Sequence, residues 1–129
     1  MKIYNSLTGR KEELTLLQEG KVKIYVCGMT VYDDCHLGHA RTFLSFDMIV
    51  RYLKFKNLEV EYVRNITDVD DNILERAKEL SEEPLALTKR YISRMHSDFQ
   101  ALGMIVPDKE PKATENIDQK EADNLAKKI

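Results

Sequence analysis

Residues 22–27 alternate between branched aliphatic and other side chains. The aliphatic members are Val22, Ile24 and Val26. This two-residue period predicts a half-buried strand, which breaks at Gly28. From about residue 38 to residue 56 the large apolar residues recur three or four positions apart. That spacing predicts an amphipathic helix, which we expect to end at Asn57.

A second strand is predicted directly after this helix. It begins with Val60 and Tyr62 and extends at most to Ile66. Residues 22–66 then have the order strand, helix, strand, and about the length of one βαβ unit. Such a crossover joins parallel strands, so the predicted fold class is α/β. Because two strands make a poor sheet, we expect the chain to hold part of a larger one.

Two more helices are predicted after the second strand. The apolar face of the first holds Ile73, Leu74, Ala77 and Leu80. The second starts near residues 81–84, where a proline suits the first helical turn, and stops at Gly103. Two prolines beyond Gly103 indicate a linker. Residues 113–129 are predicted to be a weakly amphipathic helical tail or a frayed end.

Composition supports a folded domain, because 43% of the residues are hydrophobic and 33% are charged. The formal net charge of −2 argues against a dedicated basic nucleic-acid module, and we expect no DNA partner. The first residues lack the apolar run of an export signal, and we expect no membrane association. The expected location is cytoplasmic, with Cys27 and Cys35 as reduced thiols.

Chemistry-bearing residues concentrate in segment 27–41, which reads CGMTVYDDCHLGHAR. The segment leads from the carboxyl end of a strand into a helix, a position where parallel sheets bind ligands and helix N–H groups favour phosphates. His36 and His39 are three apart and should share one side of the first helical turn. Gly38 between them leaves room for a ligand to approach the backbone. Two imidazoles with helix N–H groups predict a cradle for charge on a phosphoryl group.

These residues also have ordinary interpretations. Two histidines three apart on a helix can be plain surface residues. They can be metal ligands together with Cys27, Cys35 or Asp33, although the spacing fits no common zinc finger. Cys27 by itself can be a small packed residue at the end of a strand.

A second polar cluster, NITDVDDN, occupies residues 65–72 and follows the second strand. We therefore expect it to neighbour the first cluster at one sheet edge. A calcium loop is disfavoured because Ile73 stands where that loop needs glycine. The ordinary interpretation is helix capping, with Thr67 or Asp68 as the N-cap and the next aspartates in the first turn. Capping does not exclude a functional role for Thr67.

Four motifs together resemble the cysteinyl-tRNA synthetase family, whose class I catalytic domain is of the Rossmann type. They are CGMTVYD at 27–33, HLGHAR at 36–41, NITDVDD at 65–71 and EPKAT at 110–114. The second resembles the family's HIGH signature with Leu37 in place of isoleucine. A related cysteine ligase of mycothiol synthesis shares much of this pattern but tends to carry proline where Val31 stands. On this resemblance, residues 1–112 are the N-terminal half of a Rossmann-type catalytic domain with flanking helices, and residues 113–129 begin a connecting segment.

The resemblance implies a role for each motif. Cys27 would be the first of four ligands to one zinc ion, which would bind the substrate thiolate and so reject serine. The residues implied to contact cysteine are Gly28, Thr30 and Thr67. Those implied to contact ATP, which is used with Mg²⁺, are Thr30, His36, Gly38 and His39. The two histidines would be the catalytic pair.

The implied reaction is formation of cysteinyl-adenylate from cysteine and ATP, followed by transfer to tRNA(Cys) in protein synthesis. The family's other zinc ligands, its second, lysine-bearing ATP loop and its anticodon-binding domain have no counterpart in these 129 residues. We therefore expect an N-terminal portion that does not activate cysteine alone and holds zinc only weakly. Two alternatives stay open: a small nucleotidyl transferase that uses the same histidines, and a non-catalytic nucleotide-binding or interaction module.

Overall fold

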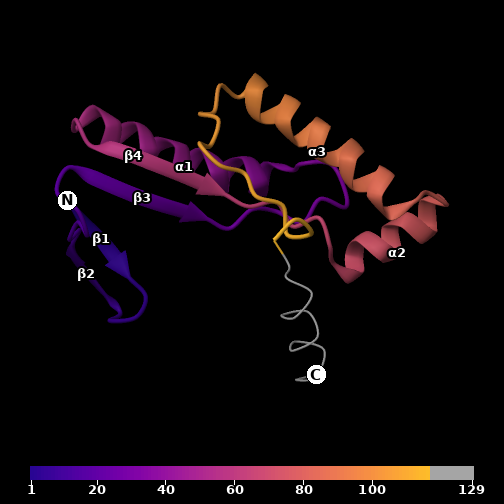
Figure 1. Cartoon of the computed structure of the whole chain (residues 1–129), viewed down its shortest axis with the longest axis horizontal. Coiled ribbons are helices and arrows are strands. Elements are labelled where there is room, and N and C mark those ends of the chain that lie inside the picture. Colours follow the sequence, from indigo (N-terminus) through magenta and orange to yellow (C-terminus); the bar gives the residue numbers. More distant parts are fainter. Residues whose placement is uncertain (117–129) are drawn as a thin grey trace.

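The computed structural model describes residues 1–116 and contains four strands and three helices in that part of the chain (Figure 1). In chain order they are β1 (Lys2–Asn5), β2 (Arg10–Glu13), β3 (Lys21–Val26), α1 (Leu37–Phe55), β4 (Glu59–Arg64), α2 (Asp71–Leu80) and α3 (Pro84–Ala101). The predicted strand, helix, strand order is confirmed. The predicted tail falls largely on residues 117–129, outside the described part.

The two strands predicted from the apolar pattern pair in parallel, as expected for a crossover unit. Val22 lies opposite Val60, and Ile24 lies opposite Tyr62. Helix α1 connects the strands and packs against β4, as Figure 1 shows. This arrangement confirms the α/β fold class and places the carboxyl ends of β3 and β4 side by side.

Segment 108–113 runs along β4 on the side away from β3. Arg64 donates its backbone N–H to Lys109 O (3.1 Å), and Ile66 donates to Pro111 O (2.9 Å). Isolated bridges in the same segment are also parallel. The linker interpretation of this proline-containing segment was therefore wrong. Pro111 pairs through its carbonyl, which is the way proline is tolerated at a sheet edge.

Strands β1 and β2 form an antiparallel hairpin that the apolar pattern did not predict. Lys2 lies opposite Glu13, and Asn5 lies opposite Arg10. Gly9 precedes β2 with a φ of 68°, a turn conformation that suits glycine. Six of the hairpin's eight strand residues are exposed, so its strands carry no buried face from which a period could be recognised.

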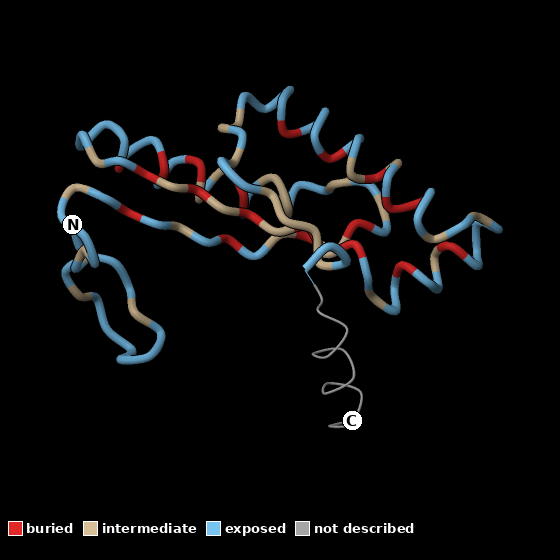
Figure 2. Tube along the Cα trace, in the orientation of Figure 1, coloured by how far each residue is buried: buried red, intermediate tan, exposed pale blue. Residues whose placement is uncertain are grey.

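The core lies between the parallel strands and the inner faces of the helices. Its members on α1 and α3 are Phe43, Val50, Leu53, Leu87, Tyr91, Met95 and Phe99. Figure 2 shows the buried positions along one side of α3, which also packs against α2. No helix within residues 1–116 is both long and apolar enough to cross a membrane.

Helix α2 differs from its prediction at two points. Its buried residues are Ile73 and Ala77, whereas Leu74 and Leu80, predicted on the same face, are exposed. Its N-cap is Asp70, whose carboxylate accepts the N–H of Asn72 (2.9 Å). The chain remains extended for several residues beyond β4, so the helix starts later than expected. Of the expected caps, Thr67 instead forms a bridge with Thr30, and Asp68 accepts hydrogen bonds from Thr114.

Candidate functional site

The two polar clusters meet beyond the ends of β3 and β4. Thr30 and Thr67 form a parallel bridge. Val31 donates its N–H to Thr67 O (3.1 Å), and Thr67 donates to Met29 O (3.3 Å). The prediction that the clusters share one sheet edge is confirmed.

Gly28 lies against the backbone of Asn65. A Cβ at Gly28 would stand 1.7 Å from Asn65 O, far inside any allowed contact. The Gly28 N–H also donates to Asn65 Oδ1 (2.7 Å). Close backbone approach therefore explains why glycine occupies this position.

His36 and His39 form the start of α1. His36 is the N-cap, and its Nδ1 accepts the N–H of Gly38 (3.0 Å). His39 Nδ1 in turn accepts the N–H of His36 (3.3 Å). The result is a reciprocal capping box built from two histidines, and the rings stack with centroids 3.8 Å apart.

These hydrogen bonds fix the tautomers of the two neutral rings. A ring nitrogen that accepts a backbone N–H carries no proton, so in both histidines the proton lies on Nε2. Partial burial, and then the nearby His36, lower the pKa of His39 from its ordinary value of 6.5. At neutral pH the His39 ring therefore offers an Nε2–H donor without a positive charge.

Gly38 is used differently from the sequence-based expectation. A Cβ there would lie 2.7 Å from Cε1 of His36, so the missing side chain makes room for the His36 ring. The Gly38 N–H is already bound to the same ring. The space through which a ligand was expected to reach the Gly38 backbone is thus occupied by the His36 ring. Contact of Gly38 with ATP stays a prediction.

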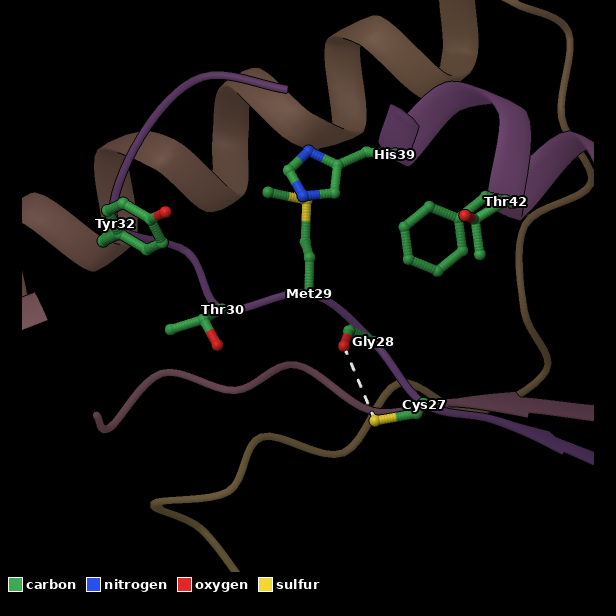
Figure 3. Close-up of a pocket in the computed structure, with 8 residues that line it drawn as sticks. Cys27, Gly28, Met29, Thr30, Tyr32, His39 and Thr42 are labelled. Carbon is green, nitrogen blue, oxygen red and sulfur yellow. Dashed lines mark hydrogen bonds between the residues drawn. The ribbon is translucent and has the colours of Figure 1, made fainter. Parts of the chain in front are cut away.

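A cavity of about 300 Å³ opens between the loop after β3 and the first turns of α1 (Figure 3). It is lined by Cys27, Gly28, Met29, Thr30, Tyr32, His39, Thr42 and Phe43. Four of the seven predicted site residues are among them, and His36, Gly38 and Thr67 are not. Thr42 and Phe43 were missed, although their positions three and four residues after His39 place them on its helix face.

Two charged pairs tether the loop that joins the cavity to the histidines. Asp33 pairs with Arg76 of α2 (3.3 Å), and Asp34 pairs with Arg94 of α3 (2.8 Å). Cys35 contacts Met29 Sδ at 3.5 Å, and burial raises the pKa of its thiol to about 11. The side chains of Asp33 and Cys35 are thus already in contact with other protein groups, Arg76 and Met29 respectively.

The end of β4 is anchored by a buried arginine. Arg64 lies with its guanidinium 4.7 Å from the centroid of the Phe99 ring and 5.2 Å from that of Phe43. Its Nη2 donates to Glu110 at 2.5 Å. Four residues further along, Asp68 accepts hydrogen bonds from the N–H (3.0 Å) and hydroxyl (2.5 Å) of Thr114. Both contacts fasten segment 108–114, which contains the fourth sequence motif, to the site.

Residues 1–116 contain no group of three or more histidine, cysteine or acidic side chains arranged to hold a metal ion. Cys27 is exposed and lines the cavity. One thiolate does not make a zinc site, and no such group forms around Cys27 within residues 1–116. The alternative of a local site built from the histidines with Cys27, Cys35 or Asp33 is not supported.

A parallel α/β unit with a cavity at the strand ends and paired imidazoles at the start of the following helix has the form of a Rossmann-type catalytic domain. Over residues 13–128 the sequence matches the family described as tRNA synthetases class I (C) catalytic domain. The chain belongs to this family.

Relatives named cysteine–tRNA ligase match most of the chain. It is 58% identical over 118 residues to that of Chromohalobacter salexigens, a match that covers 92% of this chain and 26% of the relative. For Methylococcus capsulatus the identity is 58% over 118 residues, covering 92% and 25%. For Aliivibrio salmonicida it is 59% over 117 residues, covering 91% and 25%. The chain thus spans about a quarter of the length of these relatives.

Proposed function

We propose that this chain supplies part of the active site of a cysteine–tRNA ligase, which activates cysteine with ATP and Mg²⁺ and transfers it to tRNA(Cys). The observation that carries this proposal is the stacked pair His36 and His39, because His39 lines a cavity that Cys27 also lines. Phosphate stabilisation and thiol recognition are the two tasks of this reaction, and these side chains suit them. Location in the cytoplasm, where such a ligase works, is part of the same proposal.

In the activation step, a carboxylate oxygen of cysteine attacks the α-phosphorus of ATP. A new P–O bond forms, the bond to the bridging oxygen breaks, and pyrophosphate leaves with its electron pair. The Nε2–H donors of His36 and His39 would meet charge that develops on the phosphoryl oxygens. The capping box holds both rings before substrate arrives, so little reorganisation is needed. Thr30 and Gly38 are proposed to contact ATP beside them.

Gly28, Thr30 and Thr67 are proposed to hold the cysteine, so that Thr30 would contact both substrates. Cys27 is proposed to give one ligand to a zinc ion whose other donors lie outside the described residues. Zinc bound there would favour a thiolate over a hydroxyl and so reject serine. The exposed thiol of Cys27 is compatible with this role.

A chimaera tests the proposal. The chain replaces the 118-residue segment that it matches in the Chromohalobacter salexigens ligase, and ATP–pyrophosphate exchange is measured with and without cysteine. We expect exchange that depends on cysteine. His39→Asn should lower its rate about 100-fold, the usual cost of one lost transition-state donor. His96→Asn is the matched control, because His96 lies on α3 and contacts Glu110. A folded chimaera without cysteine-dependent exchange would overturn the proposal.

A further inference from the structure

Asn65 contacts two of the residues assigned to the cysteine pocket. It follows β4 directly and is half-buried. Its Oδ1 accepts the N–H of Gly28 at 2.7 Å, and its Nδ2 faces Thr67 Oγ1 at 3.4 Å. One side chain therefore connects the loop after β3 with the extension of β4.

The direction of these hydrogen bonds determines what Thr67 can do. The Gly28 N–H can only donate, so the atom facing it is the carbonyl oxygen of the Asn65 amide. The amide NH₂ then points to Thr67, whose oxygen accepts. The Thr67 hydroxyl hydrogen is left free to donate to another group.

We propose that Asn65 is a positioning residue that aligns Gly28 with Thr67 and keeps the Thr67 hydroxyl oriented as a donor toward bound amino acid. The identity of the ligand as cysteine rests on the proposed function, whereas the alignment of Gly28 with Thr67 does not. Asn65 lies outside the lining of the cavity and acts through these two neighbours.

A role in general folding is distinguishable from this one. The bridge between Thr30 and Thr67 is held by backbone groups, through the N–H groups of Val31 and Thr67. Loss of the Asn65 side chain leaves those bonds in place. Its removal should therefore disturb the residues proposed to hold cysteine and spare the paired histidines on α1.

Asn65→Asp separates the two contacts. A carboxylate still accepts the Gly28 N–H, but it accepts from the Thr67 hydroxyl as well and so reverses that bond. Asn65→Ala removes both contacts. Asn72→Ala is the control, because Asn72 belongs to the same polar cluster and its side chain bonds only Asp70 among the described contacts.

Two measurements decide the proposal. The first is amide hydrogen exchange of Gly28 in the 129-residue chain. We expect the protection factor of the Gly28 N–H to be unchanged in Asn65→Asp and Asn72→Ala. In Asn65→Ala it should fall at least about tenfold. Unchanged protection in Asn65→Ala would overturn the alignment role, whatever the ligand is.

The second is the KM for cysteine and for ATP in the chimaera. Asn65→Asp should raise the KM for cysteine about tenfold, as expected for one lost hydrogen bond, and leave that for ATP within about twofold. An unchanged KM for cysteine, or equal losses for both substrates, would overturn the proposal. If the unsubstituted chimaera does not activate cysteine, the proposed function fails and hydrogen exchange alone decides the role of Asn65.

Discussion

The imidazole of His36 lies on that of His39, with ring centroids 3.8 Å apart and planes inclined by 22°. Each ring accepts a backbone N–H through Nδ1, so the pair caps α1 and presents two Nε2 atoms. Because a positive charge on His39 at this distance would be repelled by His36, the stack disfavours protonation of His39. The stack therefore makes the state of the site depend on pH.

We expect His39 to titrate below its ordinary pKa of 6.5, because burial and His36 both disfavour its charged form. His36→Asn should raise the pKa of His39 only part of the way, because burial is the larger cause. NMR titration of the His39 ring protons measures this pKa in the unsubstituted chain and in the variant. A His39 pKa at or above 6.5 in the unsubstituted chain would contradict the stacked geometry.

The same shift has a consequence for stability. The unfolded chain binds a proton at His39 at a higher pH than the folded chain does, so folding is favoured by the neutral ring. This contribution is fully present above pH 6.5 and declines as the pH falls toward the lowered pKa. Urea unfolding between pH 5 and about 7.5 should show this decline, and His39→Asn should reduce it.

Gly28→Ala is expected to lower the free energy of unfolding by about 2–3 kcal/mol, at the upper end for overpacking. The new Cβ would collide with Asn65 O, which belongs to the backbone and cannot rotate away. Gly20→Asn is the control, since no atom lies within 4 Å there and asparagine tolerates its φ of 73°. Equal urea midpoints for Gly28→Ala and the original chain would refute the close approach.

The two cysteines should differ strongly in reactivity. Cys27 is exposed, whereas Cys35 is partly buried with a thiol pKa of about 11. At pH 8 only about one Cys35 side chain in a thousand is a thiolate, the form that reacts. Iodoacetamide should therefore modify Cys27 at least about tenfold faster, as measured by peptide mass spectrometry. Cys27→Ser and Cys35→Ser identify each site, and equal rates would contradict the structure.

The Asp68–Thr114 contact should show energetic coupling. Asp68→Ala removes the buried carboxylate that accepts both the N–H and the hydroxyl of Thr114, at an expected cost of about 2 kcal/mol for two hydrogen bonds to a charged group. Thr114→Val removes only the hydroxyl. In a double-mutant cycle measured by urea unfolding, the second substitution should cost clearly less when the first is present. Strict additivity would mean that the hydroxyl bond contributes nothing.

The central α/β unit was predictable because its apolar residues follow regular periods. Val22 and Val26 in β3 and Phe43 and Val50 in α1 all enter the core. The shared sheet edge of the two polar clusters followed from parallel pairing. The hairpin β1–β2 was not predictable in this way, because Lys2–Asn5 and Arg10–Glu13 bury almost nothing.

Within the site, residue types were easier to predict than their neighbours. The sequence indicated His36 and His39 but not that both rings accept backbone N–H groups and so cap the first turn of α1. Gly38 was expected to admit a ligand, yet the His36 ring fills that space. Asn65 belonged to the second polar cluster, but its role was not predictable, because its contacts with Gly28 and Thr67 depend on how two strands are aligned.

Charging of tRNA tests the central claim most directly. The chimaera with the Chromohalobacter salexigens ligase is incubated with tRNA(Cys), ATP, Mg²⁺ and labelled cysteine or serine. We predict that cysteine and not serine is attached to the tRNA, and that Cys27→Ala abolishes the attachment. A chimaera that folds but attaches no cysteine, or attaches serine equally well, would contradict the account.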